Sequence, residues 1–453
     1  MQLKRELGLF SAALIVVGGI IGSGIFFTPA ATAAALPSGA WVVFVWALGG
    51  LVALAGALTY AELGAMMPEA GGAYVYIREA FGPLPAFLSA WMNAGLISSG
   101  AIAAVAMGFA GYLSKFVALD AVGGQLGVAS LTIVALTITN ILGIKPGVAV
   151  QNVLTIAKIV ALAGLAVAGV VLLFGGGHAA PSAGDAGRAI ADSLAAAGAG
   201  HVAPVAPPLL QGFASAFVAV LFTIGGWQQM NMIAAEIRDP ARNIPRALAI
   251  GIGIVIAIYL SVTGTYLAAL GRDGLAASAA PAADTAARIG GAAAATAITF
   301  SAMLSILGFV ALALLANARV VYALGADVPL LTIAGSVHPR FGSPYVALLM
   351  LGGWSLALLL ATKGSIGTLL GGVVFADWIF FALGAASVFR LRKVMPELAR
   401  PYKALGYPWL PAFFVAAGVV GILSAYVSEF RMSLFGTGLL VVGAVIWAGA
   451  RRR

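Results

Sequence analysis

The chain has 453 residues, of which 62% are hydrophobic and only 9% are charged, and its formal net charge is +9. Ordinary soluble domains carry roughly 25% charged residues, so this composition excludes an ordinary soluble protein. The sequence contains no cysteine, which excludes disulfides, a disulfide-linked partner chain and cysteine-based metal sites. Its three histidines fall in expected loops, and we therefore expect no metal and no cofactor.

Apolar runs repeatedly reach the roughly 20 residues that a helix needs to cross a bilayer. We predict an all-α membrane protein that forms a single transmembrane domain over residues 1–453. The first run is too long, and too closely followed by a second, to be a cleaved signal peptide. The third and eighth runs exceed a perpendicular crossing and are expected to be tilted. The twelve expected spans are 10–35, 39–66, 83–115, 126–143, 148–175, 212–236, 244–270, 295–325, 343–361, 365–391, 408–427 and 432–450.

Lysine and arginine between the spans indicate orientation, because they gather on the cytoplasmic side. With a cytoplasmic N-terminus, most of them lie inside. This predicts a multi-pass protein of the cell inner (plasma) membrane with both termini cytoplasmic. The positive charge then faces anionic membrane lipid and does not argue for nucleic acid. The outer segments hold only Lys115, Arg188, Arg272, Arg288, Lys363 and Arg431.

The first span is interrupted near its middle by the sequence Gly-Ser-Gly at 22–24. Glycine weakens a helix interior, and serine can bond local backbone groups. Bare backbone at membrane depth is tolerated only where protein buries it or where it lines a cavity. A second half-helix that starts near Ile25 would present free N–H groups to an anion such as a carboxylate. The carbonyls of 19–21 would be free to accept from an ammonium group.

The sixth span has a comparable interruption at 223–227. Phe222, just before it, is expected to act as a lid over a ligand or simply to pack, and Asn231 is expected to bond backbone of the first span. Two interrupted helices in corresponding places point to a transporter's substrate site, although such glycines also permit close helix packing. An α-amino acid carries both of the required charges.

Spans one to five (10–175) and six to ten (212–391) start on opposite sides of the membrane, because five is odd. This predicts an inverted repeat with broken helices 1 and 6, and a peripheral helix pair at 408–450.

Four segments between spans carry separate expectations. The stretch 68–79 reads as a turn and a short interfacial helix, and 238–246 as a basic inner loop. The stretch 176–211 is expected to be a flexible outer loop, or alternatively an external gate, and 271–294 a second outer loop.

A few ionisable residues lie within or near spans, where they are costly and usually functional. Lys158 lies near mid-membrane, about 15 Å into the fifth span, and is either a proton-exchanging or fixed cation or a static brace. Asp377 is either a coupling carboxylate or a satisfied polar group beside Trp378. Glu62 and Glu236 are expected to pair with inner-loop arginines, either as a gate or as simple ion pairs.

Short motifs follow one another in a fixed order over nearly the whole chain. They are 5–10 (RELGLF), 20–26 (IIGSGIF), 60–64 (YAELG), 68–74 (PEAGGAY), 146–147 with 151–152 and Lys158, 225–227 (GGW) with Asn231 and Glu236, 242–245 (RNIP), 317–319 (NAR), 338–344 (HPRFGSP), 400–402 (RPY) and 406–408 (GYP). In these motifs the chain resembles the APC superfamily of amino acid carriers, and within it the L-type amino acid transporter (LAT) branch and its bacterial relatives.

This resemblance implies a five-plus-five inverted-repeat (LeuT-type) core and sodium-independent transport, with Lys158 in the place where sodium-coupled relatives hold an ion. The chain departs from the pattern at Gln228, at 326–329, and at 308–313, where the small hydroxyl that often faces the lysine is missing. Coupling or gating would involve Lys158, Phe222, Asn231 and Asp377. The substrate contacts implied by the resemblance are Ile20, Ile21, Gly22, Ser23, Gly24, Phe222, Thr223 and Gly225.

These observations predict secondary transport of L-amino acids by alternating access, as exchange or as proton-coupled uptake. Neutral amino acids are favoured because no acidic residue is evident beside either break. A cationic amino acid or polyamine antiporter is the alternative. An alternative from a different functional class is a membrane-embedded sensor or a channel. An enzyme would need a nucleophile–base set or metal ligands, which are not evident in the sequence. We expect a monomer or weak oligomer.

Overall fold

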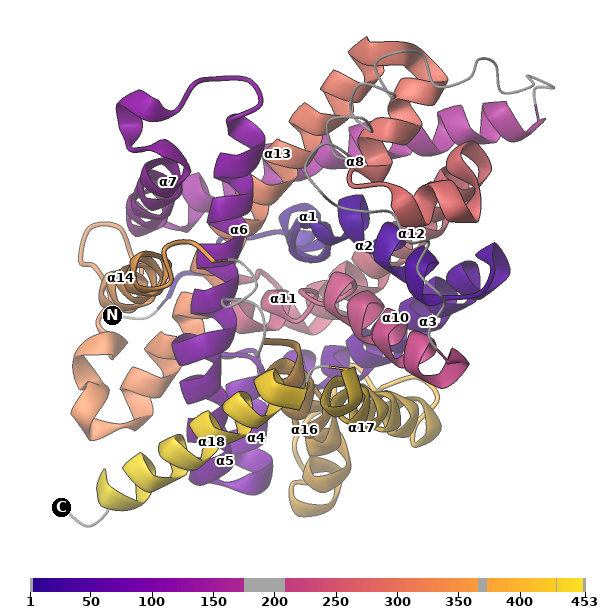
Figure 1. Cartoon of the computed structure of the whole chain (residues 1–453). Coiled ribbons are helices and arrows are strands. Elements are labelled where there is room, and N and C mark those ends of the chain that lie inside the picture. The colour runs from indigo at the N-terminus through magenta and orange to yellow at the C-terminus, as the bar shows by residue number, and fades with distance from the viewer. Residues whose placement is uncertain (1–2, 175–207, 366–372, 429, 451–453) are drawn as a thin grey trace.

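The computed structural model describes residues 3–174, 208–365, 373–428 and 430–450, and these residues form helices joined by short connections (Figure 1). Within the described ranges, the strand-like pairing is one parallel bridge between Leu7 and Ile237. Most of the expected outer loop 176–211, and with it the possible external gate, lies outside the described residues.

The helices follow one another in the order that the apolar runs predict. In the first part of the chain they are α1 (Leu9–Ile20), α2 (Gly24–Ala35), α3 (Gly39–Met66), α4 (Ala73–Phe81), α5 (Pro83–Met92), a π-helical turn (Asn93–Ile97), α6 (Ser98–Leu113), a 3₁₀ turn (Asp120–Val122), α7 (Gly124–Ile141) and α8 (Ile144–Phe174). They continue with α10 (Leu209–Thr223), α11 (Gln229–Met232), a 3₁₀ turn (Ala234–Glu236), α12 (Pro240–Ala277), α13 (Pro281–Asp327), a 3₁₀ turn (Pro329–Gly335), α14 (Tyr345–Ala361), α16 (Val373–Val394), α17 (Trp409–Ser428) and α18 (Phe430–Ala450).

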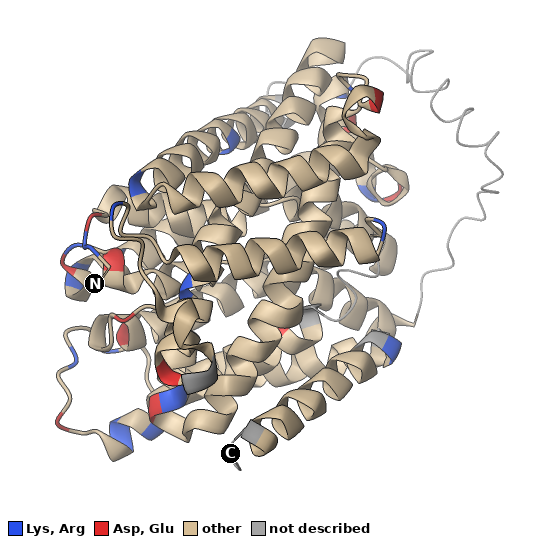
Figure 2. Cartoon of the chain, turned by 90° about the vertical axis from the view of Figure 1, so that its left-hand side faces the viewer, with Lys and Arg blue, Asp and Glu red and all other residues tan. Residues whose placement is uncertain are grey.

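Many of these helices are long and apolar enough to cross a membrane. Figure 2 shows the charged residues gathered mainly at the side of the molecule where the N-terminus lies, while the long middle faces of the helices carry few. The total of twelve crossings stays a prediction. Among the described residues eight segments meet the length and composition for a span, namely Leu9–Ala35, Gly39–Met66, Pro83–Leu113, Gly124–Ile141, Ile144–Val171, Pro240–Ala277, Pro281–Asp327 and Trp409–Val427, and the shorter apolar helices are Leu209–Thr223, Tyr345–Ala361 and Ser433–Gly449.

The short helix expected after the second span is present as α4, which follows a turn at Gly71 and Gly72. The basic inner loop 238–246, in contrast, is mostly helix, and that expectation is wrong. α12 begins at Pro240, because the fixed φ of proline and its missing N–H suit the first helical turn.

The expectation of a second outer loop at 271–294 is also wrong over most of that stretch. α12 continues to Ala277 and α13 begins at Pro281, so only a short connection separates the two helices. The alanine-rich sequence here has high helix propensity, which explains the result. Backbone kinks at Gly271 and at 290–291 bend these outer ends away from the long helices.

The two interrupted helices lie in the middle of the molecule. Figure 1 shows α1, α2, α10 and α11 near the centre, with α7, α14 and α18 at the periphery. The third span is also irregular, because the π-helical turn Asn93–Ile97 separates α5 from α6. Such turns frequently occur at functional sites, and this one places Asn93 beside the central cavity described below.

Both acidic residues near the ends of spans two and six pair with arginine, as expected. The closest partners lie on helices, and Glu62 also pairs with Arg400, in the connection between α16 and α17, at 3.7 Å. Glu62 pairs with Arg392 of α16 at 2.6 Å. Glu236 receives two hydrogen bonds of 3.0 Å from Arg319 of α13, and both side chains are only 1% exposed. Loss of one partner from such a buried pair costs about 3–5 kcal/mol, so this pair fastens the segment after α11 to α13.

The residues that lead into α1 are tied to the same segment. The Glu6 and Leu7 N–H groups both donate to the Glu236 carbonyl, at 2.9 and 3.0 Å, and the Arg238 N–H donates to the Leu7 carbonyl at 2.8 Å. The entry to the first interrupted helix is therefore anchored to the exit of the second.

Candidate functional site

The first interruption separates α1, which ends at Ile20, from α2, which begins at Gly24. The Gly22 N–H donates to the Ile20 carbonyl at 2.8 Å, which closes a tight turn between the two helices. Ser23 occupies the N-cap position of α2, but its side chain makes no capping hydrogen bond. The N-terminus of α2 therefore keeps backbone N–H groups and a positive dipole end available to an anion.

The second interruption runs from the end of α10 at Thr223 to the start of α11 at Gln229. Gly226 has a φ of 105°, a conformation that favours glycine. Its N–H donates to the side-chain oxygen of Gln228 at 2.8 Å. Gln228, one of the departures from the family pattern, therefore satisfies backbone at its own break.

The two interruptions touch each other. A Cβ atom added to Gly19 would lie 2.6 Å from the Gly226 carbonyl oxygen, and one added to Gly226 would lie 2.1 Å from the Gly19 carbonyl oxygen. Neither site can hold a side chain without backbone movement. The packing explanation for these glycines is therefore correct at these two positions, and it is compatible with a binding site beside them.

Lys158 lies midway along α8 and is fully buried. Its ammonium group donates to the carbonyls of Gly18 at 3.3 Å, Ile21 at 2.5 Å and Ser305 at 3.5 Å. An ammonium has three donors, and these carbonyls use all of them. Lys158 is therefore bonded to the end of α1 through backbone oxygens.

A small hydroxyl does reach the first break from the eighth span, and it belongs to Ser305, whose backbone carbonyl accepts from Lys158. Its hydroxyl contacts the carbonyls of Ile21 at 3.1 Å and Gly22 at 3.0 Å. The stretch 308–313, where the hydroxyl was expected, begins about one helical turn after Ser305. Ser301 and Ser305, spaced to share a helix face within an apolar run, are the signal that would have found it.

The expectation that the carbonyls of 19–21 are free is wrong for two of them. Ile20 accepts a hydrogen bond from the Tyr259 hydroxyl at 3.0 Å, and Ile21 accepts from Lys158 and Ser305. Tyr259 also lies 3.4 Å from the Thr223 carbonyl and so joins both interruptions. Sequence reasoning missed Tyr259, which is one of two tyrosines in the long, mainly apolar α12.

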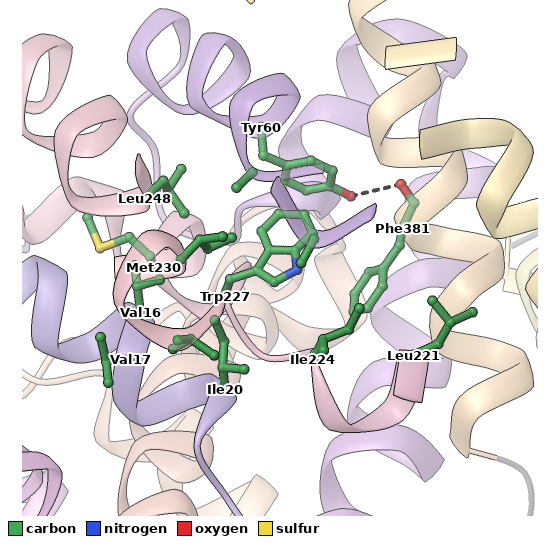
Figure 3. Packing of buried hydrophobic residues seen from close by; sticks show 14 of the residues in the cluster. Val16, Val17, Ile20, Tyr60, Leu221, Ile224, Trp227, Met230, Leu248 and Phe381 are labelled. Atoms are coloured by element: carbon green, nitrogen blue, oxygen red, sulfur yellow. Dashed lines mark hydrogen bonds between the residues drawn. The ribbon is translucent and has the colours of Figure 1, made fainter. Parts of the chain in front are cut away.

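A small cavity with a mainly apolar wall that includes several polar side chains lies against both interruptions. It encloses about 90 Å³, and since one buried water needs roughly 10–15 Å³ on this measure, it has room for about six to nine non-hydrogen atoms. Near the cavity, Trp227 packs among Tyr60, Ile224 and Phe381, and the Tyr60 hydroxyl donates to the Phe381 carbonyl at 3.1 Å (Figure 3). The residues that contribute polar atoms to its wall are Ser23, Asn93, Ser98, Thr223, Gln228, Gln229, Asn317 and Asp377.

The predicted site residues divide into two groups. Ile21 is fully buried away from the cavity wall, and Lys158 lies behind the first interruption. Asn231 is also buried, and its amide donates to the Tyr60 carbonyl at 2.9 Å and the Tyr76 hydroxyl at 3.0 Å, so the expected bond to the first span is wrong. The predicted residues that do line the cavity are Ile20, Gly22, Ser23, Gly24, Phe222, Thr223, Gly225 and Asp377.

Asp377 projects from α16 to the cavity wall, and it is the charged residue among the described residues that line it. The statement that no acidic residue lies beside the breaks is therefore wrong, because the fold brings a carboxylate from the tenth span to them. Gln229 reaches the same cavity from α11. Sequence spacing offered no signal for this meeting, since the two residues are far apart in the chain.

Comparison with known proteins gives a consistent picture. Residues 7–447 match a family model described as amino acid permease. The human b(0,+)-type amino acid transporter 1 is 30% identical over 89% of this chain and 79% of its own length. The serine/threonine exchanger of Bacillus subtilis is 28% identical over 100% of this chain and 98% of its own. The human large neutral amino acids transporter small subunit 2 is 30% identical over 89% of this chain and 72% of its own length.

We predict that Lys158→Ala lowers the rate of substrate turnover at least about tenfold while the protein stays folded. Removal of the ammonium deprives the Gly18 and Ile21 carbonyls of charged hydrogen bonds, each worth about 1.5–3 kcal/mol. The measurement is uptake by purified variant in liposomes, with size-exclusion chromatography and a thermal melt to verify folding.

The exposed Lys393, on the last turn of α16, gives a matched control as Lys393→Ala. If Lys158 carries a proton, wild-type uptake rises with an inward proton gradient and the variant loses that response. If it is a fixed cation, uptake is indifferent to the gradient. Wild-type rates in folded Lys158→Ala protein would show that Lys158 has no part in transport.

Proposed function

Because the chain belongs to the amino acid permease family, we propose that it carries L-amino acids across the membrane by alternating access and without sodium. The observation that carries this proposal is the uncapped N-terminus of α2, which opens on a small cavity between two interrupted helices. Such a terminus binds an anion through free N–H groups and its dipole.

An amino acid fits the cavity in one orientation. Its carboxylate would bind at Ser23 and Gly24, where α2 begins, and its ammonium group would face the end of α10, near Phe222 and Thr223. The Phe222 carbonyl accepts from the Gly225 N–H at 3.3 Å and the Thr223 carbonyl from the Tyr259 hydroxyl at 3.4 Å, and since a carbonyl oxygen has two lone pairs, each can also accept from an ammonium group. The cavity volume of about 90 Å³ suits a single amino acid and not a peptide.

Independence from sodium follows from the position of Lys158. Its ammonium group lies against the carbonyls of Gly18 and Ile21, which are the kind of oxygen ligands that would otherwise bind a metal cation. A fixed positive charge within a few ångströms repels a second cation strongly in a site without water. The same lysine is the candidate for proton coupling, and exchange without coupling is the alternative.

The proposed mechanism uses the two halves of the chain as a five-plus-five inverted repeat, with the helices at 408–450 at the periphery and both termini in the cytoplasm. The relative from Bacillus subtilis is named an exchanger, which favours exchange over net uptake. A disulfide to a partner chain is excluded by the absence of cysteine from this sequence. We propose a monomer or weak oligomer in contact with membrane lipid.

The central test is uptake of labelled amino acids into liposomes that contain the purified protein. We expect saturable uptake that is unchanged when sodium is replaced by choline and that is stimulated by amino acid loaded on the opposite side, or else by an inward proton gradient. A strict requirement for sodium would contradict the role given to Lys158. Flux that neither saturates nor responds to loaded substrate would instead indicate a channel.

We predict that conversion of the substrate carboxylate to an amide strongly weakens binding. The amide carries no negative charge, so the N-terminus of α2 loses a charge-assisted interaction worth about 1.5–3 kcal/mol, which weakens binding roughly ten- to hundredfold. The measurement is competition between each amide and its free acid for bound labelled substrate. Equal competition by the two forms would place the carboxylate somewhere other than at Ser23 and Gly24.

Phe222 lines the cavity beside the end of α10, where its ring can cover a bound ligand. We predict that Phe222→Ala slows transport more than it weakens equilibrium binding, because a lid contributes to the movement and not only to contact. Phe222→Leu keeps much of the apolar volume and provides the matched comparison. Equal losses in rate and binding for Phe222→Ala would assign Phe222 to packing or direct contact.

A further inference from the structure

The wall of the central cavity carries two hydrogen-bond acceptors that have no donor. Among the described residues, Asp377 makes neither a hydrogen bond nor an ion pair with another side chain or with backbone. Gln229 is only 5% exposed, and its side-chain oxygen is buried without a hydrogen-bond partner. Both residues line the same cavity, although they come from different helices.

The polar side chains of Asn93, Ser98 and Asn317 in the same wall are bonded to one another and to backbone. Asn93 donates to Asn317 at 3.1 Å, Ser98 donates to Asn93 at 3.2 Å, and Asn317 donates to the Ala313 carbonyl at 2.8 Å. This network therefore neutralises neither acceptor. The Gln229 oxygen is buried without a donor, which is unfavourable, and the Asp377 carboxylate is partly exposed in the cavity wall, where a ligand can reach it.

Ionisable residues within a membrane protein usually pair with an opposite charge or mark the path of a substrate or ion. The described residues that line the cavity offer no lysine or arginine to Asp377. Lys158 spends its donors on the backbone carbonyls of Gly18, Ile21 and Ser305. The described residues therefore supply no partner for Asp377, and a ligand in the cavity can supply one.

We propose that Asp377 and Gln229 form a subsite for the side chain of an amino acid that carries a positive charge. The carrier then takes amino acids with a cationic side chain in addition to neutral ones. This inference rests on the proposed transport function and adds a specificity-determining residue to it. A cationic side chain supplies both of the things that are missing here, namely hydrogen-bond donors for two acceptors and a compensating charge for the carboxylate.

Asp377 could otherwise serve the substrate's α-ammonium group, which every amino acid carries. The geometry favours the side chain, because the carboxylate position at Ser23 and Gly24 directs the α-ammonium toward the end of α10. The two roles differ in their consequences. A side-chain subsite discriminates between substrates, whereas a subsite for the α-ammonium affects all of them equally.

The test uses three amino acids of equal side-chain length that end in an ammonium, a methyl and a hydroxyl group: 2,4-diaminobutyrate, norvaline and homoserine. Purified wild type and variants are reconstituted in liposomes, and the ratio of maximal rate to half-saturating concentration is measured for each substrate. We expect wild type to carry 2,4-diaminobutyrate and norvaline. Asp377→Asn should lower the preference for 2,4-diaminobutyrate over norvaline roughly ten- to hundredfold, as for loss of a charged hydrogen bond.

Other variants separate charge from shape. Asp377→Glu retains the charge and should keep most of the preference, while Gln229→Leu removes one neutral acceptor and should lower the preference roughly two- to tenfold. Asp120→Asn removes a carboxylate from an exposed position outside the long helices and should leave all three substrates unchanged. If Asp377→Asn does not fold, Asp377→Glu and Gln229→Leu still test the subsite.

Several outcomes would overturn the inference. An equal loss for all three amino acids would assign Asp377 to the α-ammonium or to turnover. Exclusion of 2,4-diaminobutyrate by wild type, with norvaline still carried, would remove the cationic substrate. Loss of a proton-gradient response without a change in preference would make Asp377 a coupling group. If wild type takes up no amino acid from a wider panel, the proposed transport function fails, and this inference fails with it.

Discussion

The central constraint in this structure is the contact between the Lys158 ammonium and the carbonyl oxygens at the end of α1. A helix that stops inside a membrane leaves carbonyl groups without N–H partners, and each of them costs several kcal/mol in an apolar medium. Lys158 and Ser305 supply donors to that helix end from α8 and α13. The ammonium group finds acceptors and the broken helix end finds donors, so one set of hydrogen bonds reduces both costs.

This arrangement explains which polar groups remain for a ligand. Tyr259, Lys158 and Ser305 occupy carbonyls at the first break, and Gln228 occupies the Gly226 N–H at the second. The groups left over are the backbone N–H donors at the start of α2 and the acceptors of Asp377 and Gln229 elsewhere on the cavity wall. Separation of donors from acceptors favours a ligand that carries negative charge at one end and donors at the other, which is the charge pattern of an amino acid.

The sequence predicted the features that follow from local composition. Glycine and serine within an apolar run identified the first interruption, and isolated polar residues within spans identified Lys158 and Asp377. The partners of these residues could not be predicted in the same way. In helices that are apolar on all sides, hydrophobic periodicity does not indicate which face meets which neighbour, so Ser305, Tyr259 and Gln229 stayed hidden. The loop assignment at 271–294 failed because small residues suit both loops and helices.

The hydrogen bonds around the cavity also separate the helices into two sets. Tyr259 of α12 contacts the Ile20 and Thr223 carbonyls, and the Thr28 and Thr223 hydroxyls lie 2.7 Å apart, so α1, α2, α10 and α12 are joined directly. Lys158 and Ser305 approach the same breaks from α8 and α13. Movement of one set against the other must exchange the bonds made by Lys158 and Ser305, and also those that Gln151 and Asn152 of α8 donate to α1, because all of these bonds cross the boundary. Carbonyl oxygens have two lone pairs, and neighbouring acceptors lie within one helical turn. The Lys158 ammonium group can therefore change partners and remain hydrogen-bonded. Bonds of this kind allow a polar group to hold a broken helix in each of two positions, which is the physical requirement for a site that opens alternately to the two sides of a membrane.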